Sequence, residues 1–372
     1  MLVTTMTETS INQYRPSTVS PPGATLADLL EERGIKQAEL ATRMGVTPKF
    51  INELVAGKAS ITPTTALAME RALDVPADFW LVRDARYQES KARSEAETAL
   101  QSDVLWLDEL PLSDMRKFGC IKVQTNKPAY VGEALRFFGV SSVNAWREQY
   151  IKQTVETAAC RISPKDTARV GAVATWLRLG ELHAARTPRT SFNRQLFLDA
   201  LDESRRLTLI TDPGQFIPQL TALFAKCGVV VAFVRAPKGC PVSGAVRWLS
   251  PQKALVQLSL RYKTNDSLWF TFFHECGHIA LHGKKMLFLE DGNITNVEEE
   301  EANRFAADRL IAPADWAEFN PFAFTEAVIR QFATDVGIAP GIVLGRLQIE
   351  KRVPWNRFNN LKVRYVWRDS ES

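Results

Sequence analysis

The chain has 372 residues, more than one ordinary domain contains, so its length predicts two or three domains. Its 45% hydrophobic and 24% charged residues are typical of folded globular proteins and exclude the disordered and collagen-like classes. The net charge of +4 is too small to require a nucleic-acid partner or to exclude one, so any case for DNA binding depends on local residues.

The cysteine pattern and the length of the apolar runs bear on the cellular setting. Five cysteines are scattered and form no C-x-x-C pair, which indicates neither a disulfide framework nor a thiolate metal site. No apolar run reaches the roughly 18 residues of a membrane-spanning helix, and the first residues lack the features of a secretory signal. We therefore expect a cytoplasmic protein with no membrane partner.

The N-terminal half is predicted to be helical. Residues 1–22 are rich in Thr, Ser and Pro without apolar periodicity and predict a flexible tail. Residues 23–92 consist of short amphipathic segments separated by glycine and proline, which predict a small all-α domain of four or five helices. Residues 93–182 predict a helical linker region to which no chemistry can be assigned.

The segment from Gln37 to Leu54 has the spacing of a helix-turn-helix. Ala41 is small where two helices would cross, Gly45 takes the turn, and Ile51 packs the second helix on the first. The second helix is expected to enter the major groove of DNA. The candidate DNA-binding residues are Gln37, Thr47, Lys49, Phe50, Asn52 and Lys58.

The charge of this domain leaves a second interpretation open. Residues 24–93 carry equal numbers of acidic and basic side chains, so little nonspecific attraction to phosphates is available. The domain is expected either to bind operator DNA or to serve as a docking or dimerisation module. The second interpretation predicts a homodimer formed through the N-terminal domain.

Residues 183–322 combine strand and helix signals. Two strand-like stretches, Cys227–Val234 and Ala254–Leu260, precede a helix expected from about Asn265 to Leu281 and another from about Val297 to Leu310. The second stretch is a candidate sheet edge along which a peptide can add as a further strand. The predicted fold class is α+β, mostly α, with a small sheet.

Three of the four histidines lie between residues 274 and 282. His274 and His278 are one helical turn apart, so both would project from one face and could bind the same Zn²⁺ ion. Glu275 completes the pattern H-E-x-x-H, in which the glutamate takes a proton from the water that the metal binds. The alternative is a pair of buried structural histidines without metal.

A catalytic zinc ion needs a third protein ligand and one open position. Glu299 is favoured because Asn303 lies one turn later, where its amide oxygen can accept the N–H of a ligating histidine. Glu298 and Glu301 stay open as ligands, since a one-residue shift in helix phase exchanges them with Glu299. The simpler alternative for this acidic run is a solvated helix face.

Other residues near the motif have expected roles. Gly277 removes a side chain where a neighbouring element or a substrate can approach closely, and Cys276 is a small core residue. His282 is expected to be a satisfied or surface histidine, with a supporting role beside the metal as the alternative. Peptide hydrolysis also needs a donor for the transition-state oxyanion. The candidate donors are Arg247, Arg261, Tyr262 and His282.

The motif HECGHIALH at 274–282, followed by EEEANRFAADRLIAP at 299–313, resembles the ImmA/IrrE family of zinc metallopeptidases. The similarity extends over about residues 220–348 and implies a zincin-like metallopeptidase domain over residues 183–322. Asn303 stands where related zincins often carry Asp, and it keeps an acceptor oxygen. The resemblance implies that His274, His278 and Glu299 bind Zn²⁺ and that Glu275 is the general base.

The resemblance also implies a function. Known members of this family are cytoplasmic enzymes that cut helix-turn-helix repressors and so switch on phage, mobile-element or DNA-damage programmes. The segment from Pro22 to Arg86 resembles XRE-type helix-turn-helix domains of the HigA antitoxin-like branch. We therefore expect a zinc-dependent endopeptidase with a DNA-binding domain that cleaves a transcriptional repressor or related regulator. The alternative is a non-catalytic helix-turn-helix regulator or antitoxin whose C-terminal domain is a sensor.

Residues 323–372 predict a helical hairpin and a basic, aromatic tail. The order of residue types in Phe332–Pro340 resembles that in Leu40–Pro48. The helix that follows Pro340 is mostly apolar, so it is expected to pack against the protein and not to read DNA bases. Basic and aromatic side chains alternate after Lys351. We expect this tail to form a closing strand on the preceding domain, with nucleic-acid contact as the alternative.

Overall fold

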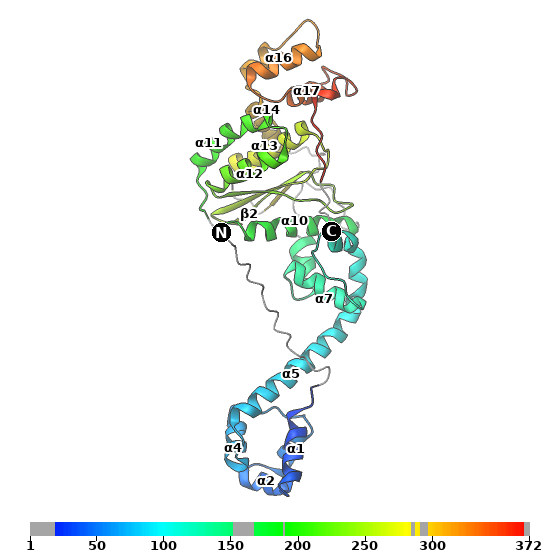
Figure 1. Ribbon diagram of the computed structural model, residues 1–372, viewed down its shortest axis with the longest axis vertical. Coiled ribbons are helices and arrows are strands. Elements are labelled where there is room, and N and C mark those ends of the chain that lie inside the picture. Colours follow the sequence, from blue (N-terminus) through cyan, green and yellow to red (C-terminus); the bar gives the residue numbers. More distant parts are fainter. Residues whose placement is uncertain (1–18, 152–166, 189, 284–286, 291–296, 368–372) are drawn as a thin grey trace, which may run out of the picture. The chain divides into compact units, whose positions relative to one another are not determined.

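The computed structural model describes residues 19–151, 167–188, 190–283, 287–290 and 297–367. The contacts within the chain divide it into two units, Met1–Ser102 and Asp103–Ser372, whose elements are labelled in Figure 1. Helices predominate among the described residues, and the second unit contains a four-stranded sheet. The predicted α+β, mostly α fold class is therefore confirmed.

The first unit is a small helical domain. Gly45 ends its second helix at a φ of 69°, a left-handed conformation that glycine adopts without strain. The side chain of Thr47 then caps the third helix by accepting a hydrogen bond from the backbone N–H of Phe50 at 3.2 Å. The predicted helix-turn-helix is thus present. The helices are α1 (Pro22–Glu32), α2 (Gln37–Met44), α3 (Pro48–Val55), α4 (Pro63–Leu73) and α5 (Ala77–Ala99).

The boundaries of this unit differ from the predicted ones. Helix α1 begins at Pro22, and residues 1–18 of the predicted tail lie outside the described residues. Helix α5 runs without a break through residues 92 and 93, where we expected the domain to end, and the division between units falls after Ser102. Alanine and long charged side chains favour a helix, so this stretch continues α5 and does not interrupt it.

Short helices open the second unit, and longer helices surround the sheet. Before the sheet lie η1 (Leu100–Glu109), α6 (Leu112–Lys117), α7 (Lys127–Phe138), α8 (Val143–Trp146), η2 (Arg147–Ile151), α10 (Thr167–Ala185), α11 (Arg194–Ser204), η3 (Arg205–Leu209) and α12 (Pro213–Ala225). The later helices are α13 (Asn265–Leu281), α14 (Val297–Leu310), α15 (Pro313–Glu318), α16 (Glu326–Val336), α17 (Pro340–Ile349) and η4 (Asn359–Leu361).

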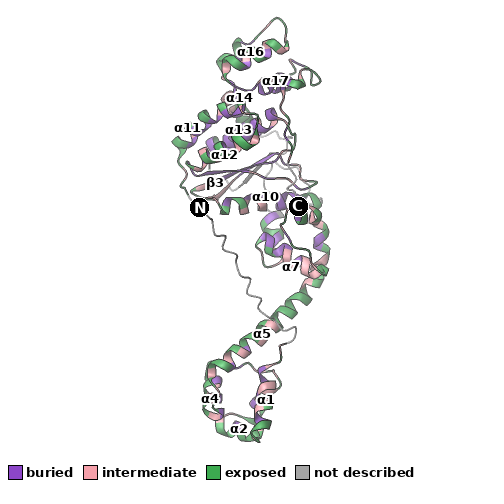
Figure 2. Cartoon of the chain, viewed as in Figure 1, coloured by how far each residue is buried: buried purple, intermediate pink, exposed green. Residues whose placement is uncertain are grey.

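The sheet has the strand order β1-β3-β2-β4. Strand β1 (Val229–Phe233) is parallel to β3 (Lys253–Leu258), and β2 (Gly244–Ser250) is antiparallel to both β3 and β4 (Leu287–Glu290). Strand β3 therefore has a partner on each side and is almost fully buried, as Figure 2 shows. The prediction that the stretch 254–260 forms a sheet edge was wrong, because β3 lies between β1 and β2 in the interior of the sheet.

Helices cover both faces of the sheet. Helix α10 packs on β1 and β3 from one face, whereas α12 and α13 pack from the other, as Figure 1 shows. The buried indole N–H of Trp176 in α10 donates to the carbonyl of Val234 at 3.0 Å, and the side-chain amide of Gln257 in β3 donates to the carbonyl of Trp176 at 2.6 Å. Helix α10 therefore belongs to the core of the second unit and differs from the linker that we expected over residues 93–182.

Helix α17 packs against α13, and α16 packs against α17. Gly337, at a φ of 72°, separates α16 from α17, and α17 is buried along most of its length, as its apolar sequence predicted. No single helix in the described part of the chain is long and apolar enough to cross a membrane. Among the described residues, one pair of helices, α16 and α17, meets those criteria jointly, and the two are bent by 113° relative to each other.

The tail after α17 also lies on the second unit. The Lys362 ammonium pairs with the Asp266 carboxylate at 2.6 Å, and Arg364 forms an isolated antiparallel bridge with Thr264 at the start of α13. Tyr365 is buried against the core. The tail thus takes the packing role that we expected, with a single bridge in place of a strand.

The packing of α10 gives a first prediction. Replacing Trp176 by Ala should lower the free energy of unfolding of the second unit by about 3–5 kcal/mol, because a fully buried indole is lost. Chemical denaturation followed by circular dichroism measures this change. His183→Ala, at an exposed position in the same helix, is the matched control and should change little. Equal stability of the two variants would mean that α10 is a linker after all.

Candidate functional sites

Helix α13 carries the H-E-x-x-H motif through the core of the second unit. Its first half is anchored by apolar side chains, with Trp269, Phe272 and Phe273 all buried against the sheet and α12. This anchoring directs His274 and His278 to the opposite side of the helix, where both are 1% exposed. The two imidazole rings stand 4.8 Å apart between centroids.

Helix α14 approaches α13 closely at Gly277. A Cβ atom at this position would lie 3.2 Å from the Cα of Ala302 and 3.2 Å from the ring of Phe305. The predicted role of Gly277 in admitting a neighbouring element therefore fits the structure, and the element is α14. This approach brings Glu299, which is 4% exposed, beside the two histidines.

Three side chains form a compact set of donor atoms. The Nε2 atoms of His274 and His278 are 3.1 Å apart, and each lies close to the Glu299 carboxylate, at 3.1 Å for His274 and 3.3 Å for His278. Bonds of about 2.0–2.1 Å at tetrahedral angles would place donor atoms about 3.3 Å apart around a divalent ion. His274, His278 and Glu299 can therefore hold such an ion.

The protonation states of these groups also suit a metal. Burial lowers the pKa of His278, although its hydrogen bond with Glu299 acts in the opposite direction. Burial alone would raise the pKa of Glu299, but hydrogen bonds and charge interactions with His274 and His278 outweigh it, and the pKa falls to about 2. A neutral imidazole and an ionised carboxylate are the forms that bind metal.

Hydrogen bonds at the Nδ1 atoms orient both rings. Asn303 Oδ1 lies 3.0 Å from Nδ1 of His274, and His282 Nδ1 lies 2.9 Å from Nδ1 of His278. With each Nδ1 atom engaged in this way, both Nε2 atoms face the Glu299 carboxylate. Asn303 thus lies at the position expected of it, and His282 lies where the alternative that we gave for it, a supporting role beside the metal, would place it.

The two other acidic candidates lie outside this donor set. Glu301 is half exposed, and its carboxylate lies 2.9 Å from Nε2 of His282. Glu298, the second residue of α14, is partly exposed. The choice of Glu299 from a run of four glutamates therefore matches the phase of α14 in the structure.

Glu275 is fully buried and does not belong to the donor set. Its carboxylate packs against the backbone of β2, where a Cβ atom at Gly244 would meet Glu275 Oε1 at 2.5 Å and Thr271 Cγ2 at 2.5 Å. Gly244 thus allows the side chain of Glu275 to fit between α13 and the sheet. Cys276, next along the helix, points into the apolar core, where burial raises the pKa of its thiol well above the ordinary value.

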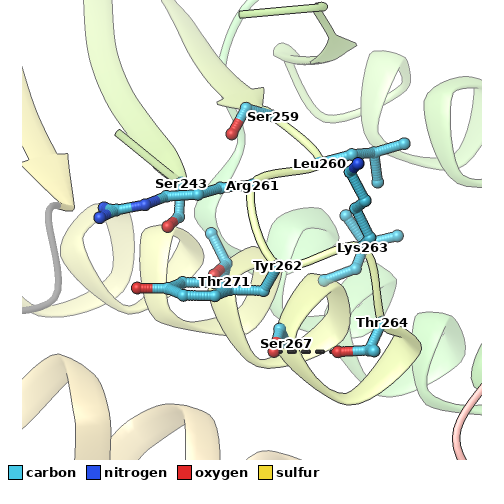
Figure 3. Close-up of a pocket in the computed structure, with 10 residues that line it drawn as sticks. Ser243, Ser259, Leu260, Arg261, Tyr262, Lys263, Thr264, Ser267 and Thr271 are labelled. Atoms are coloured by element: carbon cyan, nitrogen blue, oxygen red, sulfur yellow. Dashed lines mark hydrogen bonds between the residues drawn. The ribbon is translucent and has the colours of Figure 1, made fainter. Parts of the chain in front are cut away.

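A small pocket lies one helical turn before Glu275. It has an empty volume of about 210 Å³ and is bordered by Thr271 of α13, Ser243 before β2 and the loop after β3. Figure 3 shows Arg261 and Tyr262 on its wall, with the guanidinium 5.2 Å from the ring centroid. Thr271 on its wall lies one helical turn before Glu275.

The four candidate oxyanion donors differ in the partners that they already have. Arg247 pairs with Glu181 in α10, a carboxylate that it shares with Arg178. Arg261 donates to the carbonyl of Pro241. His282 is engaged by His278 and Glu301, whereas Tyr262 is 53% exposed at the pocket.

The candidate DNA-binding residues occupy one region of the first unit. Lys49, Asn52 and Lys58 are exposed, and Gln37 is partly exposed at the start of α2. Thr47 is exposed, but its hydroxyl caps α3, and Phe50 is partly buried against the core of this unit. Lys49 also lies 3.8 Å from Glu53.

Comparisons with known proteins identify the first unit. Residues 26–80 match the helix-turn-helix family HTH_3, so this segment is an XRE-type, DNA-binding helix-turn-helix domain. Six chains of solved structure match, including a Nostoc punctiforme protein described as a putative antidote protein of a plasmid maintenance system, with 26% identity. That match covers 22% of this chain and 91% of the other, with a TM-score of 0.22. No curated protein matches the chain.

The contact at Gly277 gives a second prediction. Gly277→Val should weaken Zn²⁺ binding, because the added side chain pushes α14 and its Glu299 away from the histidines; overpacking of this kind costs about 1–3 kcal/mol. Competition with a chromophoric chelator measures the affinity. Gly345→Val, which overpacks α17 against Asp266 at the far end of α13, is the control and should lower stability without this loss. Equal zinc affinities in both variants would contradict the prediction.

Proposed function

We propose that the second unit is a zinc-dependent endopeptidase and that the first unit directs it to DNA. The observation that carries this proposal is the triangle of His274, His278 and Glu299 with the buried Glu275 beside it. The motif resemblance to the ImmA/IrrE family supports the same assignment. The metal and its ligands, the catalytic role and the substrate are all parts of the proposal.

The donor set favours zinc among the common divalent ions. Two imidazoles and one carboxylate suit zinc, whereas magnesium and calcium prefer oxygen ligands only. Three protein ligands leave a fourth tetrahedral position for water or substrate, which is the arrangement of catalytic zinc sites. A bound zinc ion would supply Lewis acidity that lowers the pKa of a water molecule and polarises a peptide carbonyl.

Glu275 is the proposed general base. It follows His274 by one residue, so its side chain projects about 100° around the helix from that ligand and stays outside the triangle. From there its carboxylate can accept a proton from the attacking water and then deliver it to the leaving amine. The close packing of Gly244 against Glu275 restricts the carboxylate to a narrow range of positions.

The proposed substrate is a transcriptional regulator, because the same chain carries a helix-turn-helix domain. The members of the family that the motif resembles cut repressors of this class. A protein that binds DNA near a repressor would meet its substrate at high effective concentration. The target can include the helix-turn-helix domain of the chain itself, which long incubation of the intact protein with zinc would reveal.

Glu275→Gln tests the enzyme directly. Gln fills the same volume but cannot act as a base, so cleavage of a helix-turn-helix repressor should fall by at least about 10²-fold while zinc content and DNA binding persist. Gel analysis of repressor incubated with protein, with and without chelator, measures cleavage. Glu300→Gln, an exposed glutamate of α14, is the control. If E275Q retains wild-type cleavage, Glu275 is not the base. If wild-type protein with zinc cuts no repressor, the peptidase assignment is wrong and the non-catalytic regulator is favoured.

The helix-turn-helix domain gives a separate prediction. Asn52→Ala should weaken binding to an operator selected from random DNA by about 1–3 kcal/mol. Lys49→Ala should weaken binding to DNA of every sequence by a similar amount, because a lysine contact to phosphate does not depend on the base. Electrophoretic mobility shifts at fixed salt measure both. Lys226→Ala, which removes an equal charge at an exposed site of the second unit, should have no effect. If all three variants bind like wild type, the domain serves docking and not base reading.

A further inference from the structure

A chain of hydrogen bonds joins the protein surface to the buried His278. Nδ1 of His278 lies 2.9 Å from Nδ1 of His282, and Nε2 of His282 lies 2.9 Å from Oε2 of Glu301. The side chain of Glu301 is 51% exposed, that of His282 is 5% exposed and that of His278 is 1% exposed. The exposure of the three side chains therefore decreases from the surface toward the donor triangle.

The backbone holds His282 in this position. His282 follows the last residue of α13, and its N–H donates to the carbonyl of His278 at 3.1 Å. Gly283 comes next with a φ of 73°, a conformation in which the chain can leave the helix sharply. The side chain of His282 can thus turn back along the last turn of α13 and reach His278, while its other nitrogen faces α14.

Elementary chemistry fixes the direction of each hydrogen bond that joins Glu301, His282 and His278. An ionised carboxylate only accepts hydrogen bonds, so Nε2 of His282 carries the proton that Glu301 accepts. In neutral His282 the Nδ1 atom is then an acceptor, and it takes the proton on Nδ1 of His278. His278 is left with a lone pair on Nε2, the atom that faces His274 and Glu299.

We infer that Glu301 and His282 are positioning residues that together hold His278 in its Nδ1–H tautomer, with Nε2 turned toward the metal. This inference rests on the proposed zinc site. It gives His282 and Glu301 a joint role: the exposed carboxylate selects the tautomer of His282, and His282 selects that of His278. His274 obtains the same orientation in one step from Asn303.

The test uses four variants of the full-length chain. Glu301→Ala removes the terminal acceptor, Glu301→Gln keeps an acceptor oxygen at the same reach, and His282→Ala removes the middle group. Glu300→Ala removes an exposed carboxylate one residue away and is the matched control. Zinc affinity is measured by competition with a chromophoric chelator. The ring tautomers are read from ¹⁵N spectra of protein labelled at histidine, in which only four histidines contribute.

The variants are expected to differ in their affinity for zinc. Loss of a residue that supports a metal ligand typically costs 10- to 100-fold in affinity, so H282A should bind zinc about 10- to 100-fold more weakly and E301A at least about threefold more weakly. E301Q should return to near the wild-type affinity, because its carbonyl oxygen accepts the same hydrogen bond. The spectra of wild-type protein should show His278 with its proton on Nδ1, and this signal should weaken in E301A.

Several results would overturn the inference. Equal zinc affinity in E301A and E300A would do so, as would a wild-type spectrum with the proton of His278 on Nε2. The tautomer of His278 is read from metal-free wild-type protein, because zinc bound at Nε2 would by itself leave the proton on Nδ1. A variant that folds poorly therefore does not decide the outcome. Wild-type protein that binds zinc but cuts no repressor would contradict the proposed peptidase and leave this inference intact.

Discussion

The close approach of α14 to α13 is the contact on which the candidate metal centre depends. H-E-x-x-H supplies two imidazoles from one helix, but the third donor comes from a helix that begins about twenty residues later. A Cβ atom at Gly277 would crowd Ala302 at 3.2 Å, so the missing side chain favours the close approach of α14 that places Glu299 beside the two rings. The tight packing of protein interiors makes such a distance reproducible.

Much of the centre was accessible from sequence because helix periodicity carries geometric information. The spacing of His274 and His278 places them on one face, and the position of Asn303 one turn after Glu299 selects one glutamate from a run of four. The limits of α13 and α14 were predicted from apolar periodicity and from Pro313, and the structure agrees with them. Periodicity does not predict which partner a side chain finds, so the role of Glu301 required the structure.

The sheet and the domain limits were predicted less well, for a physical reason. A strand such as β3 has the same alternation at an edge and in the interior, and only its neighbours β1 and β2 decide the matter. Helix α10 lacks any motif, and its place in the core depends on the contacts of Trp176 with residues far along the chain. Local sequence patterns give little information about strand pairing and helix packing between residues that are far apart in the sequence.

Cys276 has a consequence for the behaviour of the centre under oxidative stress. Cys276 lies between His274 and His278 in the sequence, but its side chain lies in the apolar core, where burial keeps it in the thiol form at physiological pH. Peroxides react with thiolates, so a buried thiol resists conversion to sulfenic acid. A metal triangle made only of imidazole and carboxylate, with its one adjacent sulfur turned inward, would retain its ion in a cell whose thiol-ligated zinc proteins are losing theirs.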